Sequence, residues 1–370
     1  MKHFIVGPVE MYPSTKNVLE KGYTYFRTQE YGDMAKECLT KVAEMMGAEH
    51  STTIYLAASG TGAMDAVVDN CMGGINKGGN DKALVINGGS FGHRFCELLK
   101  WYNVPYDSID LDWNEVVTAK DLEPYENKGY TALFVNLDET SSGKLYDIHL
   151  LSDFCKRNNM YLIVDAISTF LADDYDMEKW GIDVTIISSQ KGLCLSPGMS
   201  IISFSRRMVD KINRKGKPNS YYFDFKPYFK NIERGQTPFT TTVSIMYELK
   251  DMLELIEKSG GKDAWIKIVQ EKANYFRKKA AEYGLTIPDY PKSYTVTPVL
   301  LEEGVNANEV VKYLRENYKI CVNPCGGKLG NRMFRVAHIG NTSLTDFDEL
   351  IEKIQLSIKE VRERNCVNVI

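Results

Sequence analysis

The sequence predicts an α/β fold built around a mostly parallel sheet. Short runs of β-branched and apolar residues alternate with helical patterns from Thr52 through Ile187, which is the βαβ order that forms such a sheet. Small, polar or charged residues follow several of these runs directly. Ligands of open α/β sheets bind beyond the carboxyl ends of the strands, so the sequence also predicts a binding site at that edge.

Length and composition place the chain among ordinary globular proteins. Its 370 residues are 44% hydrophobic and 25% charged, which indicates more than one domain and a sizeable core. We expect an irregular N-terminal arm over residues 1–20, a large domain over 21–250 and a smaller C-terminal domain over 251–370. The net charge of −4 disfavours nucleic acid as a partner.

Cysteine, histidine and hydropathy patterns disfavour several further classes. No apolar run approaches the about 18 residues that cross a membrane, and the N-terminus lacks a signal-peptide pattern. The eight cysteines and five histidines show no metal-ligand spacing, so we expect no metal site. Scattered cysteines are typical of free thiols, which favours a reducing cytoplasm.

The first elements lead to a candidate phosphate site. Apolar residues at helical spacing predict a helix over 33–46. A strand over 52–58 is then followed by Ser59-Gly60-Thr61, which opens a second helix. Free N–H groups, a positive helix end and two hydroxyls would bind phosphate. A plain strand-to-helix turn fits the same residues, and the longer dinucleotide and nucleoside-triphosphate motifs are absent.

The next two strand ends supply an aromatic ring and a hydroxyl. A strand over 82–87 ends in a glycine-rich turn that contains Phe91. An aromatic residue at this position either packs into the core or stacks on a planar ligand. A strand over 133–137 is followed by Thr140 within a cluster of acids and hydroxyls, which indicates either a turn or a binding loop.

The last strands of this region carry an acid and a lysine. Asp165 lies among apolar residues of a strand over 161–168, so it is either a structural cap or a carboxylate held for a cationic partner. Lys191 lies in the short connection between apolar runs over 184–187 and 199–204. Burial would lower the pKa of this lysine and supply a free amine that attacks carbonyls. A lysine that reaches the surface from a loop is the alternative.

The remainder of the chain alternates helices with shorter strands. Long helices are expected over 243–259 and 261–283, and strands over 294–299 and 334–338. The final helix, over 345–362, carries an apolar stripe that is typical of core packing.

One cofactor uses the parts found at the strand ends together. A phosphate cradle, a stacking aromatic, a buried carboxylate and a Schiff-base lysine are what pyridoxal phosphate requires. The phosphate anchors the cofactor and the lysine holds its aldehyde. The carboxylate keeps the pyridine nitrogen protonated, so that the ring acts as an electron sink. The sequence therefore predicts a pyridoxal-phosphate enzyme.

Motifs that span nearly the whole chain carry a family resemblance. They are Gly7-Pro8, residues 26–31, Ser59–Met64, Phe91–Arg94, Glu139–Gly143, Val164–Ser168, Ser188–Gly192 and Phe334–Val336. With them the chain resembles class V aminotransferases of the fold-type I pyridoxal-phosphate family, and is similar to alanine/serine–glyoxylate and 2-aminoethylphosphonate–pyruvate aminotransferases. The resemblance implies a large domain with a mostly parallel seven-stranded sheet flanked by helices, and a smaller C-terminal α+β domain.

The resemblance implies roles for the residues around the cofactor ring. Lys191 would form the Schiff base and carry the proton between substrate Cα and cofactor C4′. Asp165 would pair with the pyridinium nitrogen. Phe91 would stack on the ring, and Thr140 would hydrogen-bond near the ring hydroxyl. Arg335 would bind the substrate α-carboxylate through two parallel hydrogen bonds.

The resemblance also implies an active site shared between subunits. Ser59, Gly60 and Thr61 would hold the phosphate with the help of Gln190. In this family a loop of the partner subunit completes the phosphate site, and Thr240 matches that loop. The resemblance therefore implies a homodimer. It would transfer an amino group from a small amino donor to a 2-oxo acid of the glyoxylate or pyruvate type by a ping-pong mechanism.

Departures from the family pattern leave the substrate open. The family often has proline where this chain has Gln29, and tryptophan, histidine or tyrosine where it has Phe91. A phosphonate donor would need further cations. Arg27, Arg94 and Arg332 are candidates, although each also fits a surface or structural role.

A cysteine desulfurase of the same fold is the alternative enzyme. Its nucleophile would be Cys321 or Cys325, which lie in a glycine-rich segment. Desulfurases resemble one another in a histidine before the lysine and another over the ring, and here those positions are Gln190 and Phe91. A non-catalytic binding protein of this fold would lack the lysine or the buried acid, and both are present.

Overall fold

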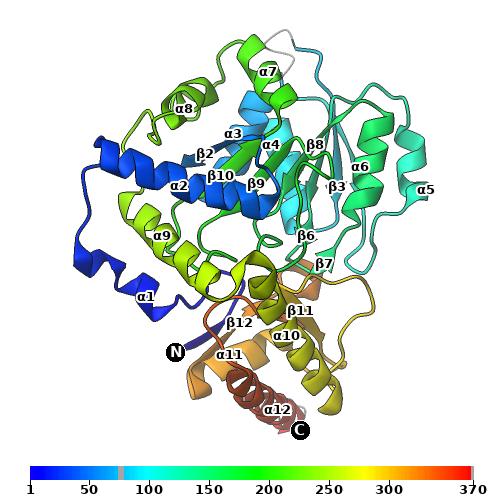
Figure 1. Cartoon of the computed structure of the whole chain (residues 1–370). Coiled ribbons are helices and arrows are strands. Elements are labelled where there is room, and N and C mark those ends of the chain that lie inside the picture. The colour runs from blue at the N-terminus through cyan, green and yellow to red at the C-terminus, as the bar shows by residue number, and fades with distance from the viewer. Residues whose placement is uncertain (74–78, 368–370) are drawn as a thin grey trace.

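The computed structural model describes residues 1–73 and 79–367. Their strands form a seven-stranded sheet, a four-stranded sheet and a two-stranded ribbon. The larger sheet and its helices make up the upper part of the molecule in Figure 1, and the four-stranded sheet lies below it with the C-terminal helices. The fold is therefore α/β, with the second sheet built mainly from the last third of the chain.

The seven-stranded sheet is parallel except for one strand. From edge to edge it consists of β2 (Thr52–Leu56), β10 (Ser200–Phe204), β9 (Val184–Ser188), β8 (Tyr161–Asp165), β5 (Ala132–Asn136), β3 (Ala83–Asn87) and β4 (Tyr106–Asp110). β10 runs antiparallel to β2 and β9, and the other neighbours pair in parallel. The mostly parallel sheet is thus confirmed, and the carboxyl ends of all strands but β10 meet at one edge.

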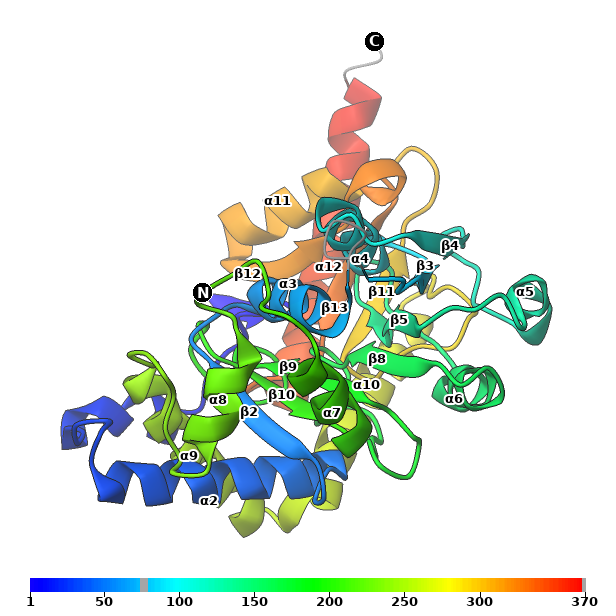
Figure 2. The same ribbon diagram turned by 90° about the horizontal axis from the view of Figure 1, so that it is seen from above.

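Helices cover both faces of this sheet (Figure 2). One face carries α2 (Gln29–Met46), α6 (Ile148–Arg157) and α9 (Val243–Lys258). The other carries α3 (Gly60–Cys71), α4 (Ser90–Trp101), α7 (Arg206–Arg214) and α8 (Phe225–Ile232). Within β8, Leu162 and Val164 join the first core, and Ile163 joins the second. The strands are buried on both faces, which is why their sequences are continuous apolar runs.

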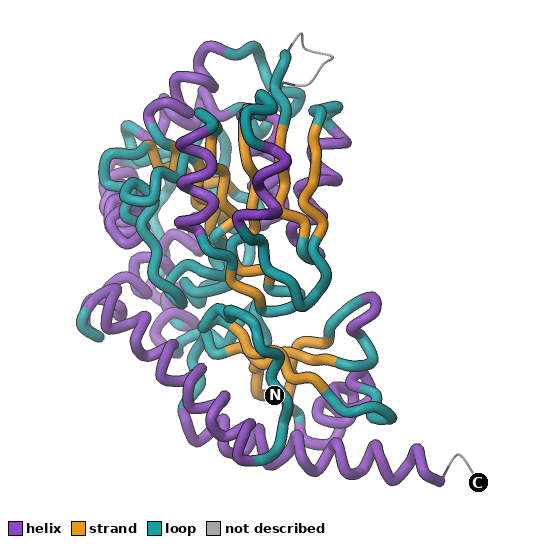
Figure 3. Tube along the Cα trace, turned by 90° about the vertical axis from the view of Figure 1, so that its right-hand side faces the viewer, coloured by secondary structure: helices purple, strands orange, loops and turns teal. Residues whose placement is uncertain are grey.

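The four-stranded sheet joins the two ends of the described chain. Its order is β1 (Lys2–Phe4), β12 (Ile320–Pro324), β13 (Met333–Ala337) and β11 (Val296–Leu300), and it packs with α10 (Gly261–Glu282), α11 (Ala307–Tyr318) and α12 (Leu344–Val367). The apolar stripe of α12 lies in this core, as expected. β1 pairs in parallel with β12, and Figure 3 shows the N-terminus beside this sheet.

Part of the expected irregular arm, residues 2–4, is thus a strand. The prediction missed it because its partner β12 lies far along the chain and no local pattern indicates the pairing. The domain boundaries at residues 20 and 250 stay predictions.

Short elements connect the larger ones. Among the described residues they are α1 (Pro13–Lys16), α5 (Ala119–Leu122), β6 (Asp138–Glu139), β7 (Lys144–Leu145) and 3-10 turns over Val18–Lys21, Glu123–Tyr125 and Gly327–Leu329. Within residues 1–73 and 79–367, no helix combines the length and hydropathy needed to span a bilayer. The expected cytoplasmic location stays a prediction.

Candidate active site

A pocket of about 250 Å³ lies at the carboxyl edge of the large sheet. It contains eight of the residues that the sequence singled out: Ser59, Gly60, Thr61, Phe91, Thr140, Asp165, Gln190 and Lys191. Asp165 is the last residue of β8, and the others lie beyond the ends of β2, β3, β5 and β9. Parallel strands bring their carboxyl ends and following loops to a common edge. The remaining two, Thr240 and Arg335, do not line this pocket.

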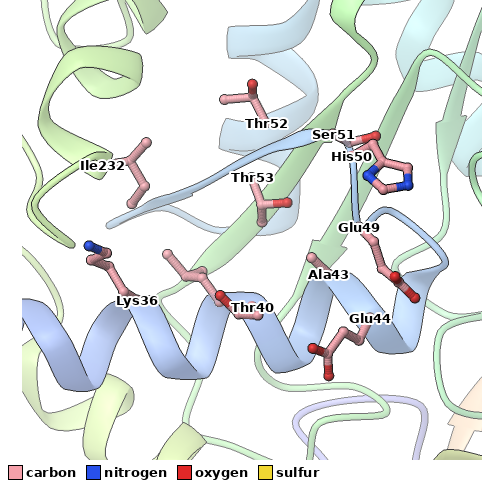
Figure 4. A pocket seen from close by; sticks show the side chains of 11 residues that line it. Lys36, Thr40, Ala43, Glu44, Glu49, His50, Ser51, Thr52, Thr53 and Ile232 are labelled. Atoms are coloured by element: carbon pink, nitrogen blue, oxygen red, sulfur yellow. The ribbon is translucent and has the colours of Figure 1, made fainter.

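A wider groove of about 490 Å³ lies on another part of the molecule, between α2 and β2 (Figure 4). Thr40 and Glu44 of α2 and Thr53 of β2 line it, and Ile232 of α8 lies at one end. None of the residues expected to do chemistry lies there. The smaller pocket at the strand ends is therefore the candidate active site.

Lys191 lies just after β9, in the connection that leads to the antiparallel strand β10. Hydrogen bonds within the connection hold it tightly, since Ser189 N donates to Met199 O at 2.9 Å and Ser189 Oγ donates to Ser196 O at 2.7 Å. Burial lowers the pKa of Lys191 to about 8, against the opposing effect of nearby carboxylates. The amine is thus available near neutral pH, as a nucleophilic lysine requires.

Asp165 is buried at the end of β8, with 1% of its surface exposed. The β5–β8 register places Asn136 beside it. Its Oδ2 accepts a hydrogen bond from Asn136 Nδ2 at 2.8 Å, and its Oδ1 accepts one from Ile167 N at 2.9 Å. Burial raises its pKa to about 6, although these hydrogen bonds and Lys191 favour the ionised form. A cation in the pocket would stabilise this carboxylate further.

The N-terminal segment forms a wall of the pocket over Lys191. Gly7 and Pro8 line the pocket, and Val9 N donates to Gln190 O at 3.3 Å. Gly7 has a φ of +143°, and a Cβ there would lie 2.9 Å from Lys191 Cδ. Only glycine fits this approach. The Gly7-Pro8 pair is visible in the sequence, but its contact with a lysine so far along the chain is not.

The residues expected to hold the phosphate, Ser59, Gly60 and Thr61, lie at the start of α3. Ser59 is the N-cap of this helix, and its Oγ accepts a hydrogen bond from Gly62 N at 3.3 Å. A Cβ on Gly60 would lie 2.5 Å from Ile167 Cδ1. The glycine therefore lets the first turn pack against the loop after Asp165, and the positive end of α3 faces the pocket.

Phe91 is held in the first turn of α4 by a buried acid that the sequence reasoning missed. Glu139 is 0% exposed. Its carboxylate accepts hydrogen bonds from Phe91 N at 3.3 Å, Gly92 N at 2.9 Å and Ser141 Oγ at 2.5 Å. A carboxylate at a helix N-terminus satisfies its free N–H groups and complements its dipole. Glu139 thus positions Phe91 in the wall of the pocket.

Thr140 connects the pocket to the four-stranded sheet. Its hydroxyl lies 3.1 Å from Ser168 Oγ, and its carbonyl oxygen accepts a hydrogen bond from the guanidinium of Arg335 in β13. Arg335 also donates to Pro324 O at 2.5 Å, while its buried Nε has no partner among the described residues. Arg335 thus contacts Thr140, which lines the pocket, but does not line the pocket itself.

Thr240 is exposed and lies outside the pocket of its own chain. Arg27 holds the segment before it, donating to Thr237 O at 2.6 Å and to Pro238 O at 3.0 Å. These contacts give Arg27 a structural role, whereas Arg94 lines the pocket. The phosphate contact of Thr240 across a dimer stays a prediction.

Asp138 is a second buried acid that the sequence reasoning did not single out. It is 0% exposed, and neither carboxylate oxygen has a hydrogen-bond partner among the described residues. Burial raises the pKa of Asp138 well above its usual range, and Asp173 and Glu139 act in the same direction. Adjacent acids after a strand are also typical of turns, so the sequence offered no sign of this burial.

A family model described as aminotransferase class V matches residues 10–342. The chain belongs to the class-V aminotransferase family. It is 27% identical to an uncharacterized aminotransferase of Methanocaldococcus jannaschii over 96% of this chain and 92% of that protein. It is 25% identical to an L-aspartate–glyoxylate aminotransferase of Paracoccus denitrificans, over 93% and 87% of the two chains.

Solved structures show the same fold. An alanine–glyoxylate aminotransferase from Nostoc sp. superposes with a TM-score of 0.90, at 23% identity, over 96% of this chain and 95% of that chain. The expected fold-type I architecture is confirmed.

As a class-V aminotransferase the enzyme uses pyridoxal phosphate. The pocket fits this cofactor in three respects: a lysine whose pKa is lowered to about 8, a buried carboxyl at its wall, and a helix N-terminus packed through glycine. Lys191 would hold the aldehyde, Asp165 the pyridine nitrogen and the α3 N-terminus the phosphate. The predicted cofactor is thus confirmed for the enzyme.

The cysteines considered for a desulfurase are poorly placed in this aminotransferase. Cys325 is 6% exposed, and its Sγ lies 3.6 Å from Ser141 O. Burial raises the pKa of the Cys325 thiol, which disfavours the reactive thiolate. Cys321 lies in β12, with its Sγ 3.1 Å from Met1 Sδ.

Proposed function

We propose that this class-V aminotransferase moves an amino group from a small amino donor to a 2-oxo acid of the glyoxylate or pyruvate type. The observation that carries the proposal is the placement of Lys191 and Asp165 in one pocket at the strand ends. Relatives named as L-aspartate–glyoxylate and serine–glyoxylate aminotransferases support the acceptor class. We further propose a ping-pong order, in which the first oxo product leaves before the acceptor binds.

Bound pyridoxal phosphate supplies an electron sink that acidifies the α-hydrogen of the substrate. Lys191 Nζ would hold the cofactor aldehyde, and as a free amine it would act as the base that takes the proton from the substrate Cα. Its pKa of about 8 suits this task, because a general base works best when its pKa lies near the working pH. Asp165 holds the pyridine N–H proton.

Other residues orient the reactants. Ser59, Gly60 and Thr61 would hold the phosphate, with the help of Gln190, and Phe91 would stack on the ring. Thr140 would hydrogen-bond near the ring hydroxyl, and Arg335 would bind the substrate carboxylate in a bidentate pair. We propose a homodimer in which Thr240 of the partner subunit completes the phosphate site.

The test is an absorbance titration without acceptor. Purified protein with pyridoxal phosphate should show a visible band, and one donor from a panel of alanine, serine, aspartate and 2-aminoethylphosphonate should bleach it. Steady-state plots with that donor should give the parallel lines of a ping-pong order. The variant Lys191→Ala should lose turnover by a factor of at least about 10²–10⁴, and steady turnover by it would contradict the proposal.

Bleaching by 2-aminoethylphosphonate alone would select the phosphonate variant of the same reaction. Sulfide release from L-cysteine that the substitution Cys325→Ala abolishes would instead favour the desulfurase. Sulfide release that persists in that variant leaves transamination as the better assignment, because no thiol nucleophile is then required.

A further inference from the structure

Arg94 lies beside the phosphate cradle. It follows Phe91 by three positions in α4 and lines the same pocket. Its Nη1 donates a hydrogen bond to Thr61 Oγ1 at 3.2 Å, and its Cζ lies 4.9 Å from the centroid of the Phe91 ring. The guanidinium therefore contacts one residue proposed to hold the phosphate and one proposed to hold the ring.

The helix that carries Arg94 is fixed at its start. Glu139 accepts hydrogen bonds from Phe91 N and Gly92 N, and Ser90 N donates to Ser141 Oγ at 3.1 Å. Residues three apart on a helix lie on the same face, so this anchoring also fixes where Arg94 points. The side chain is half-buried, which distinguishes it from a freely moving surface arginine.

The charge of the phosphate is larger than the cradle alone can balance. A phosphate monoester carries a charge of about −2 near neutral pH. The N-terminus of α3 contributes the equivalent of about +0.5, and Ser59, Gly60 and Thr61 carry no formal charge. Within the described part of the pocket wall the cations are Lys191 and Arg94. Because Lys191 is committed to the aldehyde, Arg94 is the cation left for the phosphate.

No acid among the described residues forms an ion pair with Arg94. Its hydrogen bond to Thr61 goes to a neutral hydroxyl. A guanidinium presents five donors in a rigid fork that matches phosphate oxygens. One donor bonded to Thr61 leaves the others for an anion at the cradle.

We propose that Arg94 binds the cofactor phosphate and neutralises it together with the α3 N-terminus. This inference rests on the proposed function. The competing role is a subsite for a second anionic group of the substrate. Thr61 belongs to the cradle, whereas Arg335, on the substrate side, contacts Thr140 O and Pro324 O. Arg94 therefore contacts the residues expected to hold the phosphate, whereas Arg335 lies outside the pocket wall and contacts Thr140.

The test compares pyridoxal phosphate with pyridoxal, which has the aldehyde and ring but no phosphate. Cofactor-free wild type, Arg94→Gln, Arg94→Lys and the control Arg332→Gln are titrated with each compound by visible absorbance. Arg332 is an exposed arginine outside the pocket. Arg94→Gln should raise the Kd of pyridoxal phosphate about 10- to 100-fold, as expected for a lost hydrogen bond to a charged group, and leave that of pyridoxal nearly unchanged.

Arg94→Lys, which keeps the charge, should recover part of the affinity for pyridoxal phosphate. Arg332→Gln should match wild type with both compounds. Inorganic phosphate should compete with pyridoxal phosphate in wild type and less in Arg94→Gln. These results together would assign Arg94 to the phosphate rather than to the packing of Phe91.

Two results would overturn the inference while leaving the proposed function intact. Equal losses for both compounds would make Arg94 a packing residue that acts through Phe91. An unchanged Kd for pyridoxal phosphate, with a higher KM for donors that carry a second acidic group, would assign Arg94 to the substrate. A wild-type protein that forms no visible band with either compound would instead remove the proposed function, and the inference with it.

Discussion

Replacing Asp165 by asparagine should stabilise the cofactor-free enzyme at neutral pH. The wild-type carboxyl is 1% exposed, and burial raises its pKa from 3.8 to about 6. Because the folded-state pKa lies above the unfolded value, its stabilising contribution is present below about pH 4 and is lost as pH rises through about 6. Above about pH 6, the difference between the unfolded and folded pKa values lowers the unfolding free energy of wild type by about 3 kcal/mol.

The substituted amide fits the hydrogen bonds already present. Its oxygen can accept the Ile167 N–H that Asp165 Oδ1 accepts now. Its NH₂ group can donate to Asn136 Oδ1, a buried atom with no partner among the described residues, once the Asn136 amide turns over. The turned amide leaves Asn136 Nδ2 where Oδ1 has no partner now, so one buried polar atom of Asn136 is unpaired before and after the substitution. The variant removes the charge and leaves the number of unpaired atoms at this residue unchanged.

The assay is urea unfolding of cofactor-free wild type and Asp165→Asn from about pH 5 to about pH 8. The difference in unfolding free energy should be small at the acid end and grow to about 3 kcal/mol in favour of the variant near neutral pH. Asp147→Asn changes an exposed N-cap of α6 and should match wild type, because asparagine caps as well as aspartate.

With pyridoxal phosphate bound, wild type should be more stable than Asp165→Asn, because the pyridine N–H gives the wild-type carboxylate a cationic partner. Turnover of Asp165→Asn should fall by about 10²–10³, the cost of losing one preorganised electrostatic contact. A cofactor-free variant that is less stable than wild type at every pH would refute the assignment of a strained, ionised Asp165.

Three further substitutions test other contacts. Gly7→Ala should weaken pyridoxal-phosphate binding in a titration, because the new Cβ would lie 2.9 Å from Lys191 Cδ; unchanged binding would show that the wall does not constrain the lysine. Glu139→Gln should lower the unfolding free energy by about 1–3 kcal/mol, measured in urea, because it weakens the cap of α4. Arg335→Lys should raise the KM of the amino donor about 10-fold with unchanged cofactor affinity, because lysine cannot form a bidentate pair; an unchanged KM would exclude Arg335 from carboxylate binding.

The composition of the pocket was largely predictable from sequence. Parallel strands send their following loops to one edge whatever their order in the sheet. For that reason Phe91, Thr140, Asp165 and Lys191 could be grouped without knowledge of which strands are neighbours. The strand order itself, and the antiparallel course of β10, depend on packing between distant segments and left no local pattern.

The roles of the two adjacent acids could not be predicted. Asp138 and Glu139 occupy successive positions of β6, and successive side chains of a strand point to opposite sides. Glu139 therefore reaches the α4 N-terminus, while Asp138 is left without a hydrogen-bond partner among the described residues. The orientation of β6 decides which of the two acids points toward α4. A strand of two residues is too short to show an alternating pattern, so this orientation could not be predicted from the sequence.

The pairing of β1 with β12 has a consequence for how the enzyme is made. About 320 residues separate Phe4 from Pro324, and ribosomes add about 5–20 residues per second. The first strand therefore waits roughly 16–64 s for its partner. During that interval the large sheet can fold, and the hydrogen bond from Val9 N to Gln190 O can already hold the segment with Gly7 near Lys191. The hydrogen bond from Val6 N to Asn323 Oδ1 can form only afterwards, so the N-terminal segment is attached to the two sheets at different times during synthesis.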